Sequence, residues 1–289
     1  MFAALLYYLI VKPISMLPLN VLHGVSRVLR FVLFDLVGYR KKIIRNNILN
    51  SFPEKTDQER KSIEREFQLH FCDLIVESIK NFSISEEQVF KRMTFENTEV
   101  FKTLGDQNKS IILVGGHYGN WELFALAIAR YMPHECRAFY TPLSNAFWDK
   151  KMKQSRSKYG LQMYSIKKSK ELFAENASRL TCTIFATDQS PRNPSKAYWT
   201  SFLNQDTGVQ FGAEKFSQEY AMPVVFGEMK KIKRGYYHID FKILIEQPER
   251  MPYGEITEVH TRALESQIQK APEYYLWTHR RWKHKRPNS

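Results

Sequence analysis

The chain has 289 residues, of which 43% are apolar, with 20 Phe and 15 Tyr, and this composition excludes an intrinsically disordered protein. Its length fits one large domain, or one domain with an appendage. A formal net charge of +13 indicates an anionic partner, such as a membrane surface, phosphorylated substrates, an acidic protein or nucleic acid. Cys72, Cys136 and Cys182 show no zinc or disulfide spacing, which is typical of a reducing compartment.

Residues 1–38 predict an N-terminal membrane anchor. The apolar run 2–11 is followed by Lys12, and as a helix it reaches only about 15 Å, half of a bilayer core. A second apolar stretch, 28–37, is interrupted by Arg30 and Asp35. We therefore expect helices that lie in the interface or span imperfectly, with the basic residues 40–42 at the boundary. The alternative is an ordinary buried N-terminal helix. A cleaved signal peptide is not expected.

The next segment predicts a long amphipathic helix. Residues 56–59 form a capping box, and the apolar side chains after it recur at helical spacing. Those side chains are Ile63, Phe67, Phe71, Leu74, Ile75, Ile79 and Phe82. A polar connector is expected around residues 95–97.

From residue 111 onward, strand and helix patterns alternate. The expected strands are 111–114, 137–140, 162–166, 181–187, 223–229 and 236–245, and the expected helices are 121–131, 145–158, 169–178, 212–220 and 256–269. Residues 189–208, with Pro191 and Pro194, are expected to form a loop. This alternation predicts an α/β fold with a mostly parallel central sheet flanked by helices.

Residues 115–122, Gly-Gly-His-Tyr-Gly-Asn-Trp-Glu, place His117 where a buried strand ends and a helix begins. Such turns in open α/β sheets are common ligand sites. Asn120 can cap the helix, and Glu122 lies in its first turn. In the functional interpretation Glu122 holds one imidazole nitrogen, the other removes a proton from a hydroxyl, and backbone N–H groups of the turn stabilise an oxyanion. The alternative is a capped helix beside a structural histidine.

Three other features allow either a structural or a functional interpretation. Asp188 ends a buried strand, so it either caps the following loop or orients a substrate at the same sheet edge. Arg156 belongs to a basic helix, which is either a solvated face or a phosphate-binding surface. Residues 277–282 interleave Trp, His and Arg, a pattern that suits an interfacial belt or stacked RNA bases. The seven other histidines show no metal-ligand spacing.

Several of these motifs resemble one known family. Residues 116–122 are similar to the signature of the late acyltransferases of lipid A biosynthesis, the lauroyl/myristoyl acyltransferase family, which is similar to the wider glycerolipid acyltransferase group with its His-x4-Asp/Glu motif. Further matching positions occur in the family's order along nearly the whole chain. They are Tyr39-Arg40, Asn46-Asn47-Ile48, Phe52-Pro53-Glu54, Asn145, Arg156, Gly160, Asp188-Gln189 and the C-terminal block 272–283.

The resemblance implies an acyltransferase at the cytoplasmic face of the inner membrane. Such an enzyme moves a fatty acyl chain from acyl carrier protein to a hydroxyl of a lipid A precursor, an anionic lipid, and needs no metal or organic cofactor. His117 and Glu122 would be catalytic, as general base and its partner. The residues expected to bind substrate are Arg156, Asp188, Gln189 and Asn120. We expect an anchor over residues 1–38 and a glycerolipid-acyltransferase-like α/β domain over residues 39–289.

Alternative functions stay open at this point. The same chemistry could act on another acceptor, namely an amino-acid lipid, a glycolipid or a lysophospholipid, because Thr141 and the tripeptide 202–204 depart from the family pattern where acceptor selection is plausible. A thioesterase would use the same residues on water. A basic, membrane-peripheral nucleic-acid-binding protein is a further alternative, but the sequence contains no known nucleic-acid motif, so we expect no nucleic-acid partner.

Overall fold

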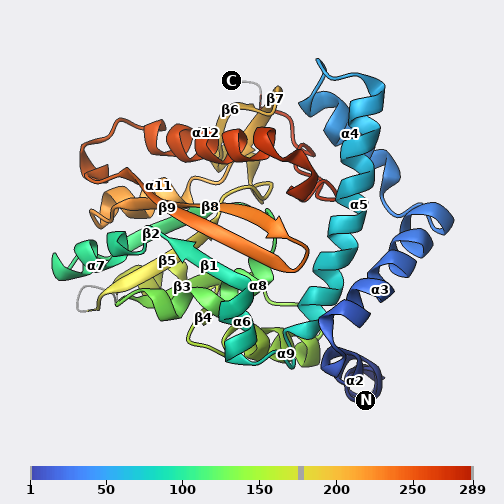
Figure 1. The fold of residues 1–289 in the computed structure, drawn as a ribbon. Helices are drawn as coiled ribbons and strands as arrows, with labels where there is room; N and C mark the ends of the chain where they lie inside the picture. Colours follow the sequence, from blue (N-terminus) through green and yellow to red (C-terminus); the bar gives the residue numbers. More distant parts are fainter. Residues whose placement is uncertain (1, 175–178, 288–289) are drawn as a thin grey trace.

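The computed structural model describes residues 2–174 and 179–287, and its centre is a seven-stranded sheet (Figure 1). The strand order is β1-β9-β8-β2-β5-β3-β4, and neighbouring strands are parallel except β8 and β9. The strands are β1 (Met93–Glu96), β2 (Ile111–Gly115), β3 (Glu135–Tyr140), β4 (Gln162–Ser165), β5 (Thr181–Ala186), β8 (Val224–Lys233) and β9 (Tyr236–Ile245). The α/β fold with a mostly parallel sheet is therefore confirmed.

Strand β2 lies in the middle of this sheet and leads to the His117 turn. Its residues 111–114 are buried, as expected for a central parallel strand. It pairs with β5 as far as Gly115, opposite Ala186, but with β8 only as far as Val114, opposite Phe226. The carboxyl end of β2 therefore keeps β5 as its neighbour after its pairing with β8 has ended.

Helices cover both faces of the sheet (Figure 1). Helices α11 (Gly212–Glu219) and α12 (Glu255–Lys270) lie on one face, and α6 (Glu86–Arg92), α8 (Trp121–Ala127) and α9 (Ala146–Arg156) lie on the other. Asn120 caps α8 and Asn145 caps α9, because each side chain accepts a hydrogen bond from a free N–H group of the first turn. Helix α10 is described over Ser169–Ala174, and residues 175–178 of the expected helix lie outside the described residues.

The prediction of a polar connector around residues 95–97 is wrong. Residues 93–96 form β1, an edge strand parallel to β9, between α6 and α7 (Glu99–Asp106). Met93 is buried, and the ring of Phe95 stacks on Phe241 of β9 at 5.6 Å. A four-residue strand carries too little periodicity to be visible in sequence, and here its pairing with β9 decides the structure.

The loop expected over residues 189–208 is also wrong in its second half. Strands β6 (Tyr198–Phe202) and β7 (Gln205–Val209) form an antiparallel hairpin. Its two turn residues, Leu203 and Asn204, both have positive φ, of 50° and 61°, which is the geometry of a two-residue hairpin turn that asparagine tolerates better than leucine. Pro191 and Pro194 precede the hairpin. Prolines are equally typical of an irregular loop, so the sequence did not predict the two strands.

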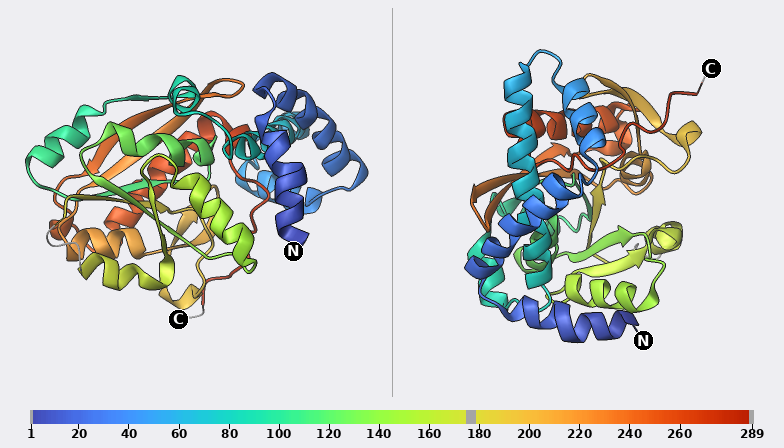
Figure 2. Two further views of the ribbon diagram at one scale, coloured as in Figure 1. Left: turned by 90° about the horizontal axis from the view of Figure 1, so that it is seen from below. Right: turned by 90° about the vertical axis from the view of Figure 1, so that its right-hand side faces the viewer.

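The N-terminal helices pack on the outer side of the long helix α5 (Asp57–Lys80), at one side of the α/β core (Figure 1; Figure 2, left). The capping box of α5 is confirmed, because Thr56 and Glu59 exchange both hydrogen bonds. The segments before α5 are α1 (Phe2–Leu6), α2 (Lys12–Met16), α3 (Leu19–Arg30) and α4 (Lys41–Ser51), with π-helical turns over Tyr7–Val11 and Phe31–Leu36.

These N-terminal helices leave many large apolar side chains exposed. Leu22 and Phe34 are buried against the core, but the opposite faces are open to solvent. The exposed side chains are Phe2, Leu5, Tyr8, Leu9, Ile10, Met16, Leu17, Val21, Val25, Val28, Phe31, Val32, Leu36 and Val37. In the described part of the chain, no single helix is both long and apolar enough to cross a bilayer, but helices 2–16 and 19–36, bent by 119° at their junction, meet those requirements together. The proposed division after residue 38 stays a prediction.

Candidate functional site

The turn after β2 is held in a fixed shape by its glycines and its helix cap. Gly119 has a φ of +58°, and a Cβ atom there would lie 2.4 Å from Sδ of Met229, so the position requires glycine. The next residue, Asn120, accepts a hydrogen bond from Leu123 N–H at 2.8 Å. Its side-chain amide donates to Glu77 of α5 at 2.6 Å. Asn120 is buried by these contacts, behind the turn, where it supports His117.

The C-terminal segment clamps the same turn from outside. Gly119 N–H donates to the carbonyl of Tyr274, and Leu276 N–H donates to the carbonyl of His117. The C-terminal segment is itself held by α4, because the side-chain amide of Asn47 donates hydrogen bonds to the carbonyls of Trp277 and His279 at 2.9 and 3.0 Å. The family-like motifs around Asn47, His117 and the C-terminus therefore meet at one place, although more than 150 residues separate the first from the last.

This position corrects the interpretation of residues 277–282 as an interfacial or RNA-stacking belt for two of its members, Trp277 and Arg281. Trp277 and Arg281 are buried. The indole N–H of Trp277 donates to the carbonyl of Pro272 at 2.7 Å, and Arg281 donates to the carbonyl of Gly208 at 2.8 Å. A buried aromatic and a buried guanidinium that bond to backbone carbonyls stabilise the fold and are not available to a surface partner.

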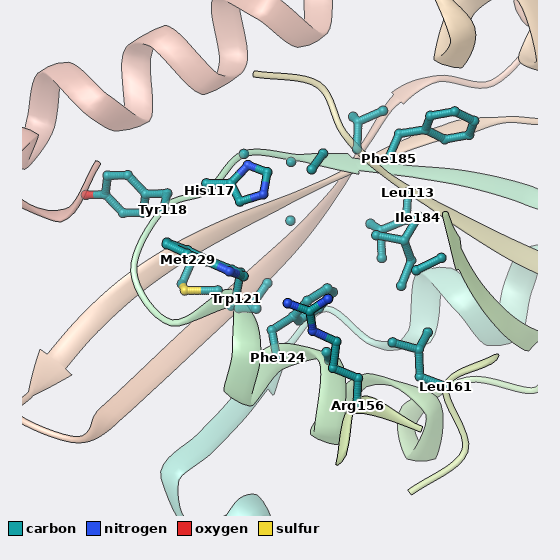
Figure 3. A pocket seen from close by; sticks show the side chains of 18 of the residues that line it. Leu113, His117, Tyr118, Trp121, Phe124, Arg156, Leu161, Ile184, Phe185 and Met229 are labelled. Atoms are coloured by element: carbon teal, nitrogen blue, oxygen red, sulfur yellow. The ribbon is translucent and has the colours of Figure 1, made fainter. Parts of the chain in front are cut away.

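His117 is paired with Asp188 (Figure 3 shows the ring at the pocket). Its Nδ1 lies 2.7 Å from Oδ1 of Asp188, and its backbone N–H donates to Oδ2 at 3.0 Å. The expectation that Glu122 holds an imidazole nitrogen is therefore corrected. The physical reason is strand register: Gly115 of β2 lies opposite Ala186 of β5, and continuing both parallel strands by two residues brings His117 beside Asp188.

The pair shifts the pKa values of both residues. Burial disfavours charge on the imidazole, but the adjacent Asp188 carboxylate outweighs burial and raises the pKa of His117 above its usual 6.5. Burial likewise disfavours the Asp188 carboxylate, but His117 and the nearby Arg281 lower the pKa of Asp188 below its usual 3.8. Asp188 is buried, whereas the His117 side chain keeps 17% of its surface exposed, so the ring reaches the pocket while its partner does not reach solvent.

Gln189 lies at the other nitrogen of the ring. Its side-chain Nε2 is 3.2 Å from His117 Nε2. With the proton on Nδ1 facing Asp188, the Nε2 lone pair accepts this hydrogen bond. The two residues of the Asp-Gln motif therefore contact opposite sides of one imidazole, and Nε2 is the atom available to a substrate.

Glu122 is paired with Arg156 instead. The guanidinium Nε donates to Oε2 at 2.8 Å and Nη2 donates to Oε1 at 2.5 Å, a two-pronged contact. Burial disfavours the charged guanidinium, but Glu122 outweighs burial and raises the pKa of Arg156. The Glu122 charge also acts on His117, where it favours the protonated ring. The solvated face proposed as one alternative for Arg156 does not describe this residue.

Three backbone amides of the turn donate hydrogen bonds within the fold. His117 N–H donates to Asp188, Tyr118 N–H to the carbonyl of Gly116, and Gly119 N–H to the carbonyl of Tyr274. These three amides fix the turn, and the expectation that backbone amides of the turn stabilise an oxyanion stays a prediction. Arg156 is a charged donor that lines the same pocket as His117.

An apolar pocket opens at His117 (Figure 3). Its empty volume is about 920 Å³ with its open mouth included. His117, Tyr118 and Arg156 are its charged or titratable side chains. The walls come from the sheet and from α8, chiefly Leu113, Phe124, Ala138, Leu161, Met163, Ile184, Phe185, Met229 and Ile239.

Two buried residues near the His117–Asp188 pair, Tyr275 and Arg281, were not predicted from the sequence. Burial raises the pKa of Tyr275 well above its ordinary range, and the neighbouring Asp188 carboxylate adds to the effect. Arg281 acts on Asp188 from the same buried side. Both belong to the C-terminal block singled out by the resemblance, which was the available signal. In the described residues, no group of three or more His, Cys, Asp or Glu side chains could hold a metal ion, and the cofactor expectation stays a prediction.

The fold and the site together define a class: an α/β protein with an imidazole–carboxylate pair at the mouth of an apolar pocket, suited to activating a hydroxyl beside a long apolar group. The chain belongs to the bacterial lipid A biosynthesis acyltransferase family, whose sequence profile matches residues 1–284. It is 23% identical over 250 residues to a lipid A biosynthesis palmitoleoyltransferase of Escherichia coli (strain K12), covering 84% of this chain and 79% of that protein. Lipid A biosynthesis acyltransferases of Shigella flexneri and Haemophilus influenzae are 23% and 24% identical, covering 84% and 86% of this chain and 79% of each relative.

Proposed function

We propose that this protein transfers a fatty acyl chain from acyl carrier protein to a hydroxyl of a lipid A precursor. Membership of the family supports acyl transfer as the reaction. The observation that carries the mechanism is the arrangement of His117, whose Nδ1 is held by Asp188 while Nε2 faces the apolar pocket. This arrangement differs from the sequence-based proposal in one respect, since Asp188 replaces Glu122 as the partner of the base.

In the proposed reaction, the acceptor hydroxyl displaces the Gln189 amide from Nε2 of His117. Nε2 removes the hydroxyl proton as the oxygen forms a bond to the thioester carbonyl carbon, and Asp188 stabilises the imidazolium. The carbon–sulfur bond then breaks, and the imidazolium returns its proton to the departing thiolate. The products are the ester and the free thiol of the carrier, and His117 is neutral again.

Arg156 is the proposed stabiliser of the negative charge that develops on the carbonyl oxygen. A fixed guanidinium in an apolar pocket acts more strongly on such a charge than a hydrated one, because little solvent screens it. Glu122 holds the guanidinium by two contacts, so it acts through Arg156 as a positioning residue. The apolar pocket beyond His117 is the proposed site of the acyl chain, where each buried CH2 group contributes about 0.8 kcal/mol.

The location and partners follow as proposals from the same family. A net charge of +13 suits both an acidic carrier protein and an anionic acceptor lipid. The exposed apolar side chains of residues 2–37 suit attachment to the cytoplasmic face of the inner membrane. The basic surface needs no nucleic acid to account for it.

The test is a purified assay with acyl carrier protein donors and a tetra-acyl lipid A precursor, comparing the wild type with His117→Ala. We expect the variant to lose about 10²–10⁴-fold in transfer, the usual contribution of a positioned general base. A circular dichroism melt close to that of the wild type would show that the loss is chemical. Wild-type transfer by the folded variant would refute the assignment of His117.

The same assay separates the alternatives. Free fatty acid that forms at the same rate with or without acceptor would identify a thioesterase. Transfer to a lysophospholipid or an amino-acid lipid, but not to the lipid A precursor, would identify another acceptor. Product mass spectrometry distinguishes these outcomes.

A further inference from the structure

We propose that a basic hollow on the outer side of α5 binds the phosphate groups of anionic lipids at the membrane surface, separately from the His117 pocket. This proposal deepens the proposed membrane attachment and does not depend on the acyl-transfer mechanism. The hollow is formed by the end of α3, the start of α4 and the first half of α5. The lining residues are Arg30, Asp35, Lys41, Arg45, Lys61, Glu64, Arg65 and Gln68.

The charges in this hollow do not balance. Its lining has five cations against two carboxylates. Arg30 pairs with Asp35 at 2.7 Å, and Arg45 pairs with Glu64 at 3.0 Å, which uses both carboxylates. The remaining cations therefore form an excess of positive charge around an open space of about 570 Å³.

Lys41, Lys61 and Arg65 are the cations in excess. None of the three forms an ion pair within the described parts of the chain. They come from two helices, so their ends can converge on one ligand without competing for one position. Lysine and arginine in this arrangement suit the oxygens of a phosphate group, to which both residues donate charged hydrogen bonds.

The floor of the hollow is polar and ordered. Gln68 is buried, its amide donates to Glu64 at 3.1 Å, and its carbonyl oxygen accepts from Arg30 at 3.4 Å. These contacts hold the base of the hollow in place, while the side chains of Lys61 and Arg65 stay exposed at its rim. A ligand would therefore meet the uncompensated charges first.

Exposed apolar side chains identify the partner as a membrane surface. Phe31, Leu36 and Val37 lie between Arg30 and Lys41 in the chain, and 50%, 66% and 67% of their respective surfaces are exposed. Cations beside exposed apolar side chains are typical of segments that insert among lipid headgroups, because the apolar groups enter the acyl region while the cations meet phosphates.

The position of the hollow argues against the carrier protein as its occupant. Helix α3, whose end lines the hollow, lies on the side of α5 away from the sheet and the His117 turn (Figure 1). The side of α5 that faces the turn contacts it through His70, whose Nε2 lies 3.2 Å from the carbonyl of Gly119. A carrier protein must deliver its thioester to the His117 pocket, whereas a membrane is broad enough to contact the outer side of α5 at the same time.

The experiment measures binding of the full chain to vesicles by flotation. One set of vesicles is phosphatidylcholine alone, and the other is equal parts of phosphatidylcholine and phosphatidylglycerol. The test variant is Lys61→Gln with Arg65→Gln, and the matched control is Lys109→Gln with Lys170→Gln, which removes two exposed cations elsewhere. Glutamine is a good helix former, so the exposed positions on α5 tolerate it.

We expect the test variant to bind the anionic vesicles about thirtyfold more weakly, because each cation near an anionic surface contributes about a fivefold factor. Its binding to phosphatidylcholine vesicles and its transfer activity in detergent are expected to match the wild type. The control variant is expected to bind both vesicles as the wild type does. Failure of the proposed acyl transfer would leave this comparison intact.

Three results would overturn the proposal. The first is unchanged binding of the test variant to anionic vesicles. The second is an equal loss on both vesicle types, which would indicate a general apolar contact. The third is normal vesicle binding with a raised KM for acyl carrier protein, which would assign the hollow to an acidic protein.

Discussion

At the scale of single residues, the site depends on which carboxylate reaches which base. Glu122 is five residues from His117, and Asp188 is 71 residues away, yet Asp188 makes the contact. Glu122 extends from the first turn of α8 toward Arg156 of α9. The two carboxylates thus have separate roles: Asp188 fixes the imidazole, and Glu122 fixes the guanidinium.

The first prediction concerns the pH dependence of Asp188→Asn. In the wild type the raised pKa of His117 places the acidic limb of the pH–rate profile above 6.5, because only the neutral ring is a base. Asparagine removes the charge that raises this pKa but leaves the burial that lowers it, so the limb moves to lower pH. The maximal rate falls about a hundredfold or more as the ring loses its orientation. A pH–rate profile of kcat/KM checks both effects, and an unshifted limb would contradict the pairing.

The second prediction separates Glu122 from Asp188. We expect Glu122→Gln to lower kcat about 10²-fold, because Arg156 loses its anchor and with it the stabilisation of developing charge. Since that variant also removes a charge that favours protonated His117, the acidic limb shifts to lower pH by less than in Asp188→Asn. Arg156→Lys is expected to lower kcat similarly, because an ammonium cannot make the two-pronged contact. Equal limb shifts in Glu122→Gln and Asp188→Asn would argue that Glu122 is the direct partner.

At the scale of elements, the His117 turn is a short loop fixed on three sides. Helix α5 supports it through Glu77, whose carboxylate accepts from Asn120, from Tyr237 of β9 at 2.9 Å and from His23 of α3 at 2.9 Å. The C-terminal segment holds it from outside, and the Asp188 carboxylate binds its first amide. Such a loop stays in one shape without a ligand, which is what a preorganised base requires.

The third prediction compares two glycines. Gly119→Ala is expected to destabilise the fold by about 1–3 kcal/mol, since it combines a strained positive φ with a clash against Met229. Gly24→Ala is the control, because it lies within α3, has open space around its Cβ position and is expected to be neutral or stabilising by about 1 kcal/mol. Urea denaturation measures both, and a Gly119→Ala variant as stable as the wild type would show that the turn is less constrained than its contacts indicate.

The fourth prediction concerns the buried network at Glu77. Replacing this carboxylate by alanine leaves buried donors of Asn120, Tyr237 and His23 without their acceptor, and we expect a loss of about 3–5 kcal/mol. The outward-facing Glu66 of the same helix is the matched control, because its replacement by alanine is expected to change stability by less than about 0.5 kcal/mol. Thermal melts measure the stability of both variants. An equal loss of stability in the two would argue against the network.

At the scale of the whole molecule, the N-terminal helices and the α/β core form one packed unit with an apolar outer surface. Helix α1 lies beside α9 (Figure 2, right). In the π-helical turn that follows α1, the hydroxyl of Tyr8 accepts a hydrogen bond from the Lys151 ammonium at 3.1 Å. Helix α9 also carries Arg156, so the apolar surface of the first helices and the mouth of the pocket are joined through one helix. Under the proposed function, a lipid acceptor would meet both while it stays in its membrane.

The fifth prediction tests this surface. Leu9→Gln with Phe31→Gln is expected to move the protein from the membrane to the soluble fraction, since each buried side chain of this size contributes about 1.5–3 kcal/mol to the attachment. Ile232→Gln is the control, because Ile232 is 63% exposed but lies at the end of β8 in the β8–β9 hairpin. Fractionation of cell extracts gives the distribution, and unaltered membrane recovery of the double variant would argue against attachment through these helices.

Local patterns in the sequence were sufficient for most elements of the core. The buried run before His117, the cap at Asn120 and the box at Thr56 each depend on neighbours in the chain, so they were visible without the fold. Strand β1 was missed because the strand it pairs with, β9, lies about 140 residues later in the chain. The hairpin β6–β7 was missed because the prolines before it are equally typical of an irregular loop.

The sequence by itself determined that a histidine ends a central strand, that the sheet is mostly parallel and that the family motifs occur in order. It did not determine the partner of that histidine, because the order of strands within a sheet is set by packing across the whole chain. Once β5 lies beside β2, parallel register places Asp188 at His117, and helix geometry directs Glu122 to Arg156. The local sequence determines which residues stand at the ends of these elements, and long-range strand pairing determines which residues they contact.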